Sequence, residues 1–271
     1  YNFVDTESSF FTLDEQGTET EVDLSGANTK SEERRAEISG TYNFSFGEKL
    51  STQTSLVIEY SELEQSGDSA NARTFTRPKG FLSASYDLTE SLELRGQIER
   101  EVGQLDFFAF ASSVDLQNGN DRAGNAELVP EQSWNYEFAI EKTFADDSQV
   151  TLSFEYRDIE DVVQRVPFLI TDSDTGNRFK VEGIGNVPEA TRWRVRLQGT
   201  QMLDRFGIQG GQLDYDMFVR DSEIEDPFSG ELRRLNAETK WFYNFTFRHD
   251  IPQSDYAWAL RVEDFENALH F

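Results

Sequence analysis

The feature that most constrains this sequence is an alternation of side chains with a period of two. Between residues 35 and 46, apolar or aromatic residues alternate with polar or charged residues. After Gly47-Glu48-Lys49 the same alternation resumes over residues 50–60. Because successive side chains of a β-strand point to opposite faces of a sheet, the two segments predict a hairpin with one apolar and one polar face.

The same unit recurs along the chain, and helical spacing is nowhere sustained. Further hairpins are predicted from the paired segments 82–88 and 92–98, 134–144 and 150–156, 193–199 and 213–219, and 241–247 and 256–262. Together these make five hairpins and ten strands, with one or two more strands expected before residue 30. The chain is therefore predicted to be all-β and antiparallel.

The predicted connections alternate between two lengths. Short turns are expected near residues 48, 90, 147, 208 and 251. Long segments rich in Asp, Glu, Asn, Gly and Ser are expected as loops at 61–76, 100–131, 158–190 and 221–237. Outer-membrane barrels sort their connections in this way, with short periplasmic turns and long extracellular loops.

The two faces of the predicted strands differ in chemistry. Opposite the apolar side chains, charges of both signs occur in mid-strand. They include Arg95, Glu137, Glu141, Glu155, Arg157, Arg192, Arg194 and Arg196. A soluble β-sandwich packs its apolar faces together, whereas a barrel in lipid turns its apolar face outward and lines a wet lumen with the polar face. Alternation alone fits both architectures.

Aromatic residues gather at both ends of the predicted strands. Trp134, Trp193 and Trp241 open strands that follow long loops, whereas Phe46, Tyr86, Phe144 and Phe247 lie beside short turns. Two such belts are typical of membrane interfaces. The ten residue steps from Trp134 to Phe144 span roughly 25 Å when tilted, which is the height of an outer-membrane apolar band. Since open sheet edges cannot stand in hydrocarbon, the sequence favours a transmembrane β-barrel.

Composition excludes several function classes. The net charge is −26, with 51 acidic and 25 basic residues, so neither nucleic acid nor an anionic membrane surface is an expected partner. Solvated, self-repelling loops account for the acidity, and a cation-collecting surface is the alternative.

The chain has no Cys and only His249 and His270, so no metal site, cofactor or catalytic site is expected. Asp172–Gly176 is a short acidic turn without the length of a calcium-binding loop.

One segment resembles a signature of TonB-dependent outer-membrane receptors. In that family a long loop ends in G-N-P-x-L-x-P-E-x-S before a strand. The matching positions here are Gly124, Asn125, Leu128, Pro130, Glu131 and Ser133, and Ala126 stands where the family usually has Pro. Arg77-Pro78, the segment 92–96, and Gly185-Asn186 before Arg192-Trp193 are also similar to the family. The resemblance covers most of residues 35–265.

The resemblance implies that residues 1–271 are a portion, of about 10–12 strands, of a barrel with roughly 22 strands. The family's plug domain and TonB box are not in this chain. The implied function is energy-coupled uptake of a scarce, bulky nutrient such as a siderophore-iron chelate, cobalamin, an oligosaccharide or a peptide. The implied partners are TonB-ExbB-ExbD, acting through a plug, and the lipid and lipopolysaccharide of the outer membrane of a Gram-negative bacterium. No cofactor and no covalent step are implied.

Some alternatives stay open at this point. Arg192, Arg194 and Arg196 are candidates for contact with anionic groups of a ligand, or for ion pairs with carboxylates of a plug or of neighbouring strands. A passive porin, a secreted β-sandwich binding module or adhesin, and an outer-membrane enzyme are the rival functions. Neither a Ser-His pair nor a metal cluster supports the enzyme.

Overall fold

The computed structural model describes residues 2–6, 10–13, 19–22, 29–67, 70–105, 113–115, 120–123, 125, 127–171, 178–236 and 238–267. Its regular elements are β1 (Asn2–Thr6), β2 (Phe10–Leu13), β3 (Glu19–Val22), β4 (Thr29–Phe46), β5 (Leu50–Gly67), β6 (Asn71–Thr89), β7 (Leu92–Val102), β8 (Ser113–Asp115), β9 (Asn120–Ala123), β10 (Gln132–Thr143), β11 (Gln149–Thr171), β12 (Arg178–Met202), the 3-10 turn η2 (Asp204–Phe206), β13 (Gly211–Glu225), β14 (Leu232–Arg233), β15 (Thr239–Asp250) and β16 (Ala257–Asn267). Within these residues, no helix has the length and apolar character needed to span a bilayer.

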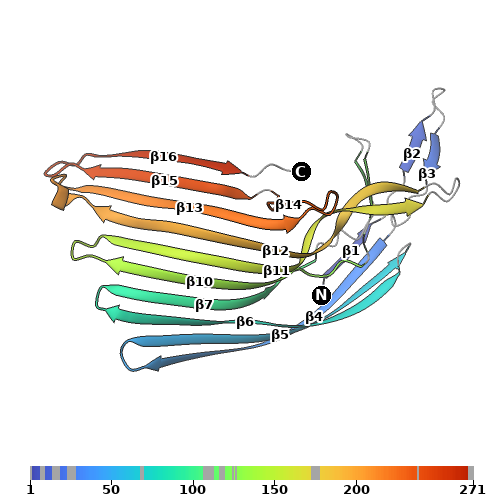
Figure 1. Cartoon of the computed structure of the whole chain (residues 1–271), viewed down its shortest axis with the longest axis horizontal. Coiled ribbons are helices and arrows are strands. Elements are labelled where there is room, and N and C mark those ends of the chain that lie inside the picture. Colours follow the sequence, from blue (N-terminus) through green and yellow to red (C-terminus); the bar gives the residue numbers. More distant parts are fainter. Residues whose placement is uncertain are drawn as a thin grey trace.

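In the described part of the chain, eleven strands follow one another across one sheet, in the order β1-β4-β5-β6-β7-β10-β11-β12-β13-β15-β16. Neighbours along this path are antiparallel, and Figure 1 shows them stacked from β4 to β16 in chain order. The ten strands predicted from alternation are β4 to β7, β10 to β13, β15 and β16, and β1 is an additional strand before residue 30. The all-β, antiparallel prediction is confirmed.

The short connections join neighbouring strands at one end of the sheet. They occupy residues 47–49, 90–91, 144–148, 203–210 and 251–256, and all five lie at the left in Figure 1. Tight turns of this kind allow consecutive strands to pair along their whole length. At the opposite end, beyond Trp134 and Trp241, lie the long connections from β7 to β10 and from β13 to β15.

Two of the segments predicted as long loops are mostly strand in the structure. Strands β5 and β6 run through most of 61–76, and β11 and β12 run through most of 158–190. Segment 221–237 is strand only to Glu225, apart from the two-residue β14. Polar residues extend the sheet because strand pairing is a backbone interaction that needs no apolar face. Val162 to Thr171, for example, pairs with Arg178 to Val187.

Among the residues that the structure describes, no protein layer covers the apolar face of the sheet. Ile38 and Leu56 are each 72% exposed. Cross-strand register aligns the apolar positions of successive strands, as in the series Ile98, Tyr136, Tyr156 and Trp193. Other large exposed side chains of this face are Tyr42, Phe44, Phe46, Ile58, Leu82, Tyr86, Trp134, Phe138, Leu152, Phe154, Val219, Trp258, Leu260 and Val262. This surface is much larger than the isolated apolar patches of soluble proteins.

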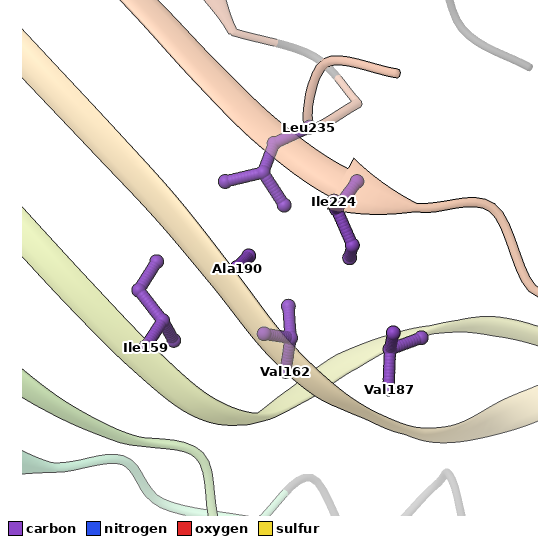
Figure 2. Close-up of a cluster of buried hydrophobic side chains, with 6 residues drawn as sticks. All are labelled: Ile159, Val162, Val187, Ala190, Ile224 and Leu235. Atoms are coloured by element: carbon purple, nitrogen blue, oxygen red, sulfur yellow. The ribbon is translucent and has the colours of Figure 1, made fainter. Parts of the chain in front are cut away.

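The buried core lies on the opposite, inner face, near the end of the sheet that carries the long connections. One cluster gathers side chains of β11, β12 and β13 under Leu235, and Figure 2 shows them around a common space. Its members are Ile159, Val162, Val187, Ala190, Ile224 and Leu235. Asp161 has a positive φ of 55°, and the register of β11 against β12 skips this residue. Sequence alternation did not predict this core.

Candidate functional site

The signature segment, defined here as residues 125–133, lies against the inner face rather than in an outer loop. Leu128 is 1% exposed and packs with Leu63 of β5, which is 3% exposed. Phe75, Leu105, Val163 and Ile184 close the cluster around them. The segment therefore joins the β5–β6 hairpin to the β11–β12 hairpin across the inside of the sheet.

Asn186 of β12 holds the middle of this segment. Its amide oxygen accepts a hydrogen bond from the Val129 N–H at 2.9 Å. Its amide nitrogen donates to the carbonyls of Val129, at 2.9 Å, and Asp161, at 2.7 Å. One side chain thus satisfies backbone groups that would otherwise be orphaned in an irregular segment. The sequence indicated Gly185-Asn186 only as a point of similarity to the family, so this role was missed.

The other signature residues act in the same structural way. Asn125 donates to the Ile184 carbonyl at 3.1 Å and accepts from the Glu127 N–H at 3.0 Å. A carboxylate oxygen of Glu131 accepts from the Val163 N–H at 3.3 Å. Pro130 is buried. Gly124 and Ala126 lie outside the described residues.

Ser133, near the start of β10, has a buried side chain on the inner face. Its Oγ accepts hydrogen bonds from the Arg157 guanidinium at 3.0 and 2.9 Å. Arg157 also pairs with Glu101 at 2.6 Å. Ser133, the last residue of the signature segment, and Arg157 therefore connect β7, β10 and β11 on the inner face.

The three arginines of β12 project from the inner face, and each meets a carboxylate of another part of the chain. Arg192 and Arg194 share Glu155 of β11, at 3.2 and 2.5 Å. Arg196 makes a two-pronged contact with Asp216 of β13, with both distances 2.7 Å. Such bidentate geometry favours Arg over Lys at this position.

Beside this row lies an aromatic and cationic patch, which we define as Arg194, Phe218, Arg220 and Phe242. The rings of Phe218 and Phe242 stack with centroids 5.6 Å apart. The guanidinium of Arg220 lies 5.0 Å from the Phe218 ring, and that of Arg194 lies 6.0 Å away. Among the described residues, no carboxylate is within ion-pair distance of Arg220. The sequence signal was an aromatic residue at a polar-face position on each of two neighbouring strands.

A second charged cluster occupies β4, β5 and β6. Glu59 is 4% exposed and meets Arg77 at 2.9 Å, Lys79 at 2.8 Å and Arg35 at 3.6 Å. Lys79 also reaches Glu37 at 2.9 Å. Because a buried carboxylate must be compensated, this cluster ties three strands together on the inner face.

Two hollows open on the same inner face. One, of about 460 Å³, is lined on its polar side by Gln53, Ser83, Arg95, Gln97 and Glu137. Another, of about 350 Å³, lies under the signature segment beside Lys79, Glu99, Glu131 and Arg157. No group of His, Asp and Glu in the described part of the chain is arranged to hold a metal ion. The inner face is thus polar, hollowed and internally charge-paired, as expected for the lining of a wet passage.

Comparisons with known proteins agree with this geometry. The family model "TonB dependent receptor-like, beta-barrel" matches residues 1–267. No curated protein sequence matches the chain. Among solved structures it is similar to the copper transporter OprC, with 13% identity and a TM-score of 0.61 over 89% of this chain and 36% of OprC.

Two further solved structures are receptors. The ferric preacinetobactin receptor BauA from Acinetobacter baumannii has 11% identity and a TM-score of 0.59, over 92% of this chain and 34% of BauA. The pyoverdine receptor FpvA from Pseudomonas aeruginosa PAO1 has 13% identity and a TM-score of 0.57, over 86% of this chain and 31% of FpvA. The chain spans about a third of the length of these proteins. It therefore belongs to the TonB-dependent receptor β-barrel family of the Gram-negative outer membrane, and its strands form part of such a barrel.

Proposed function

We propose that the protein containing this chain takes up a scarce, bulky solute across the outer membrane, with energy supplied through TonB-ExbB-ExbD. The observation that carries the proposal is the opposition of two faces on the same strands. The outer face is apolar and unpartnered, whereas the inner face is polar, hollowed and ion-paired. Family members are receptors and transporters, so a catalytic role is not proposed.

In this proposal the sheet closes with further strands around a plug, in a barrel of roughly 22 strands. The short turns near 48, 90, 147, 208 and 251 face the periplasm. The segments 61–76, 100–131, 158–190 and 221–237 rise on the extracellular side, where long connections of such barrels lie. The signature segment then packs against the inner face of the barrel near its extracellular end.

For the ligand, we propose a metal or metal-chelate with anionic groups. OprC is named as a copper transporter, and FpvA and BauA as receptors of pyoverdine and ferric preacinetobactin. The patch of Arg194, Phe218, Arg220 and Phe242 supplies cations and ring faces on the inner surface. Arg220 is the natural contact because the carboxylates beside it already pair with Arg192, Arg194 and Arg196.

The test uses the full-length protein in a Gram-negative host, with isotopically labelled ferric chelates and copper as probes. Uptake should require both TonB and the proton gradient. Arg220→Gln should weaken ligand binding about tenfold, which corresponds to about 1.4 kcal/mol. Arg248→Gln is the matched control, because Arg248 also lies on the inner face but near the short turns, where it pairs with Asp250.

The outcomes separate the parts of the proposal. Solute entry at the same rate without TonB would overturn energy coupling and favour a passive porin. Unchanged affinity in Arg220→Gln would overturn the patch as the ligand contact while leaving coupled uptake intact.

A further inference from the structure

The apolar outer face carries a groove that has no part in the proposed transport. It has a volume of about 330 Å³ and lies over β5, β6, β7 and β10. This volume is within the range of small-molecule sites in proteins, about 300–1,000 Å³. Its walls include Leu56, Pro78, Leu82, Ile98, Arg100 and Trp134.

The groove exists because Gly80 leaves a gap in the row of outward side chains. In register, Gly80 lies between Leu56 of β5 and Arg100 of β7. Its φ is +144°, and a Cβ added there would lie 2.1 Å from the Ser55 carbonyl oxygen. Since no side chain fits on Gly80, the depression is built into the backbone.

Arg100 is a cation on the largely apolar outer face. It is paired in register with Trp134, so both side chains emerge on the outward side. Its guanidinium lies 5.8 Å from the Trp134 ring and donates to the Gln132 amide oxygen at 2.6 Å. Among the described residues, no carboxylate lies within ion-pair distance of Arg100. Asp158 shares the face but is aligned with Trp134, one strand further on.

The level of Arg100 along the strand indicates what could neutralise it. Arg100 and Trp134 lie at the end of their hairpins away from the short turns. That end carries Trp134, Trp193 and Trp241, and at such an end of a membrane barrel aromatic rings lie at headgroup depth and basic side chains meet anionic headgroups. A guanidinium binds phosphate oxygens in forked geometry.

We propose that this groove binds a lipid A phosphate of lipopolysaccharide, with an acyl chain against Leu56, Leu82 and Ile98 and the phosphate on Arg100. The inference rests on the proposed function for one element only, the assignment of the long-loop end to the outer leaflet. Lipopolysaccharide occupies that leaflet in Gram-negative outer membranes. The phosphate would supply a counter-charge for Arg100, and the acyl chain would fill the space that Gly80 leaves.

The test measures binding of labelled lipopolysaccharide to the full-length protein in phosphatidylcholine nanodiscs. Arg100→Gln should weaken binding about tenfold, equivalent to about 1.4 kcal/mol. Leu56→Trp, which fills the groove from a position that is already exposed, should weaken it as well. Arg95→Gln is the matched control because Arg95 lies on the same strand but on the inner face, where it pairs with Glu141.

A second arm uses lipopolysaccharide from which the lipid A phosphates have been removed. It should bind wild type about tenfold more weakly, and Arg100→Gln should add no further loss. Equal binding of wild type and Arg100→Gln, or of both lipopolysaccharide forms to wild type, would overturn the proposal. Equally strong competition by phosphatidylglycerol would overturn the choice of lipid. No arm requires TonB or a nutrient, so failure of the uptake proposal would leave these readings unaffected.

Discussion

The chain has two apolar regions that meet different surroundings. Outward side chains such as Ile38 and Leu56 are 72% exposed, and no second layer of the described residues covers them. Inward side chains such as Leu63 and Leu128, near the signature segment, are 3% and 1% exposed. In the proposed barrel, lipid covers the first set and protein covers the second.

Exposure in the isolated chain therefore does not measure how a side chain contributes to stability. A cavity left by a buried Leu stays empty because the protein around it relaxes only partly. Space left on the lipid face is refilled by acyl chains, which are as apolar as Leu. The same substitution should therefore have unequal effects in the two regions.

The largest expected effect comes from truncating a side chain in the protein-covered region. Leu128→Ala should lower the free energy of unfolding by about 2–5 kcal/mol, because it opens a cavity under the signature segment. Leu152→Ala, on the lipid face, should cost well under half as much. Chemical unfolding of the full-length protein in lipid vesicles measures both. Equal losses would mean that protein, not lipid, covers the outward face.

The second-largest effect comes from placing an arginine on the outer face or on the inner face at the same depth in the membrane. Leu197 and Gln198 are consecutive in β12 and lie about midway between Trp193 and the turn at 203–210. Leu197→Arg should lower unfolding free energy by about 2–4 kcal/mol, the cost of a basic residue at the bilayer midplane. Gln198→Arg should be nearly neutral, since Gln198 is aligned with Asp216.

The unfolding free energies of both variants are measured in the same lipid-vesicle assay. A larger loss for Gln198→Arg than for Leu197→Arg would reverse the assignment of the two faces, and with it the proposed passage.

The smallest effect concerns a polar connection that neither lipid nor a core stabilises. Asp226, after β13, accepts hydrogen bonds from the Phe228 and Ser229 N–H groups, both at 2.9 Å, and from Arg233 at 2.5 Å. The Arg233 hydrogen bond is the main cause that lowers the pKa of Asp226 from 3.8 to about 2. Because the pKa is depressed on folding, the carboxylate stabilises this turn fully above pH 3.8, and the effect is lost as pH falls toward 2.

Hydrogen exchange of the Phe228 and Ser229 amides, corrected for the intrinsic rate at each pH, should therefore speed up across that pH window. Asp226→Asn should exchange faster at neutral pH and lose the pH dependence, and Glu48→Gln in the short turn at 47–49 should change neither. Protection in Asp226→Asn that still falls across the same window would assign the titration to another group.

Much of the fold could be predicted because alternation is a local property. The ten strand positions, the apolar face and the five short turns all follow from side-chain direction in a strand, which depends only on neighbouring residues. Strand ends were predicted less well, since β5, β6, β11 and β12 extend through polar segments where alternation no longer signals a buried face.

The inner face was predicted only as a polar surface. Glu155 and Arg194 lie 39 residues apart, and their pairing depends on the register of β11 against β12. Phe218 and Phe242 come together only through the register of β13 against β15. The signature motif identified the family by resemblance, yet its contacts with Asn186 and Leu63 arise from segments distant in sequence.

By itself, the sequence determined which side chains share a face, because the pleat of a strand reverses side-chain direction at every residue. Tertiary structure alone decided which charges meet, where the inner core forms and why Gly80 leaves a groove beside Arg100. Those features depend on backbone pairing between distant strands, and no local pattern encodes the register of such pairs.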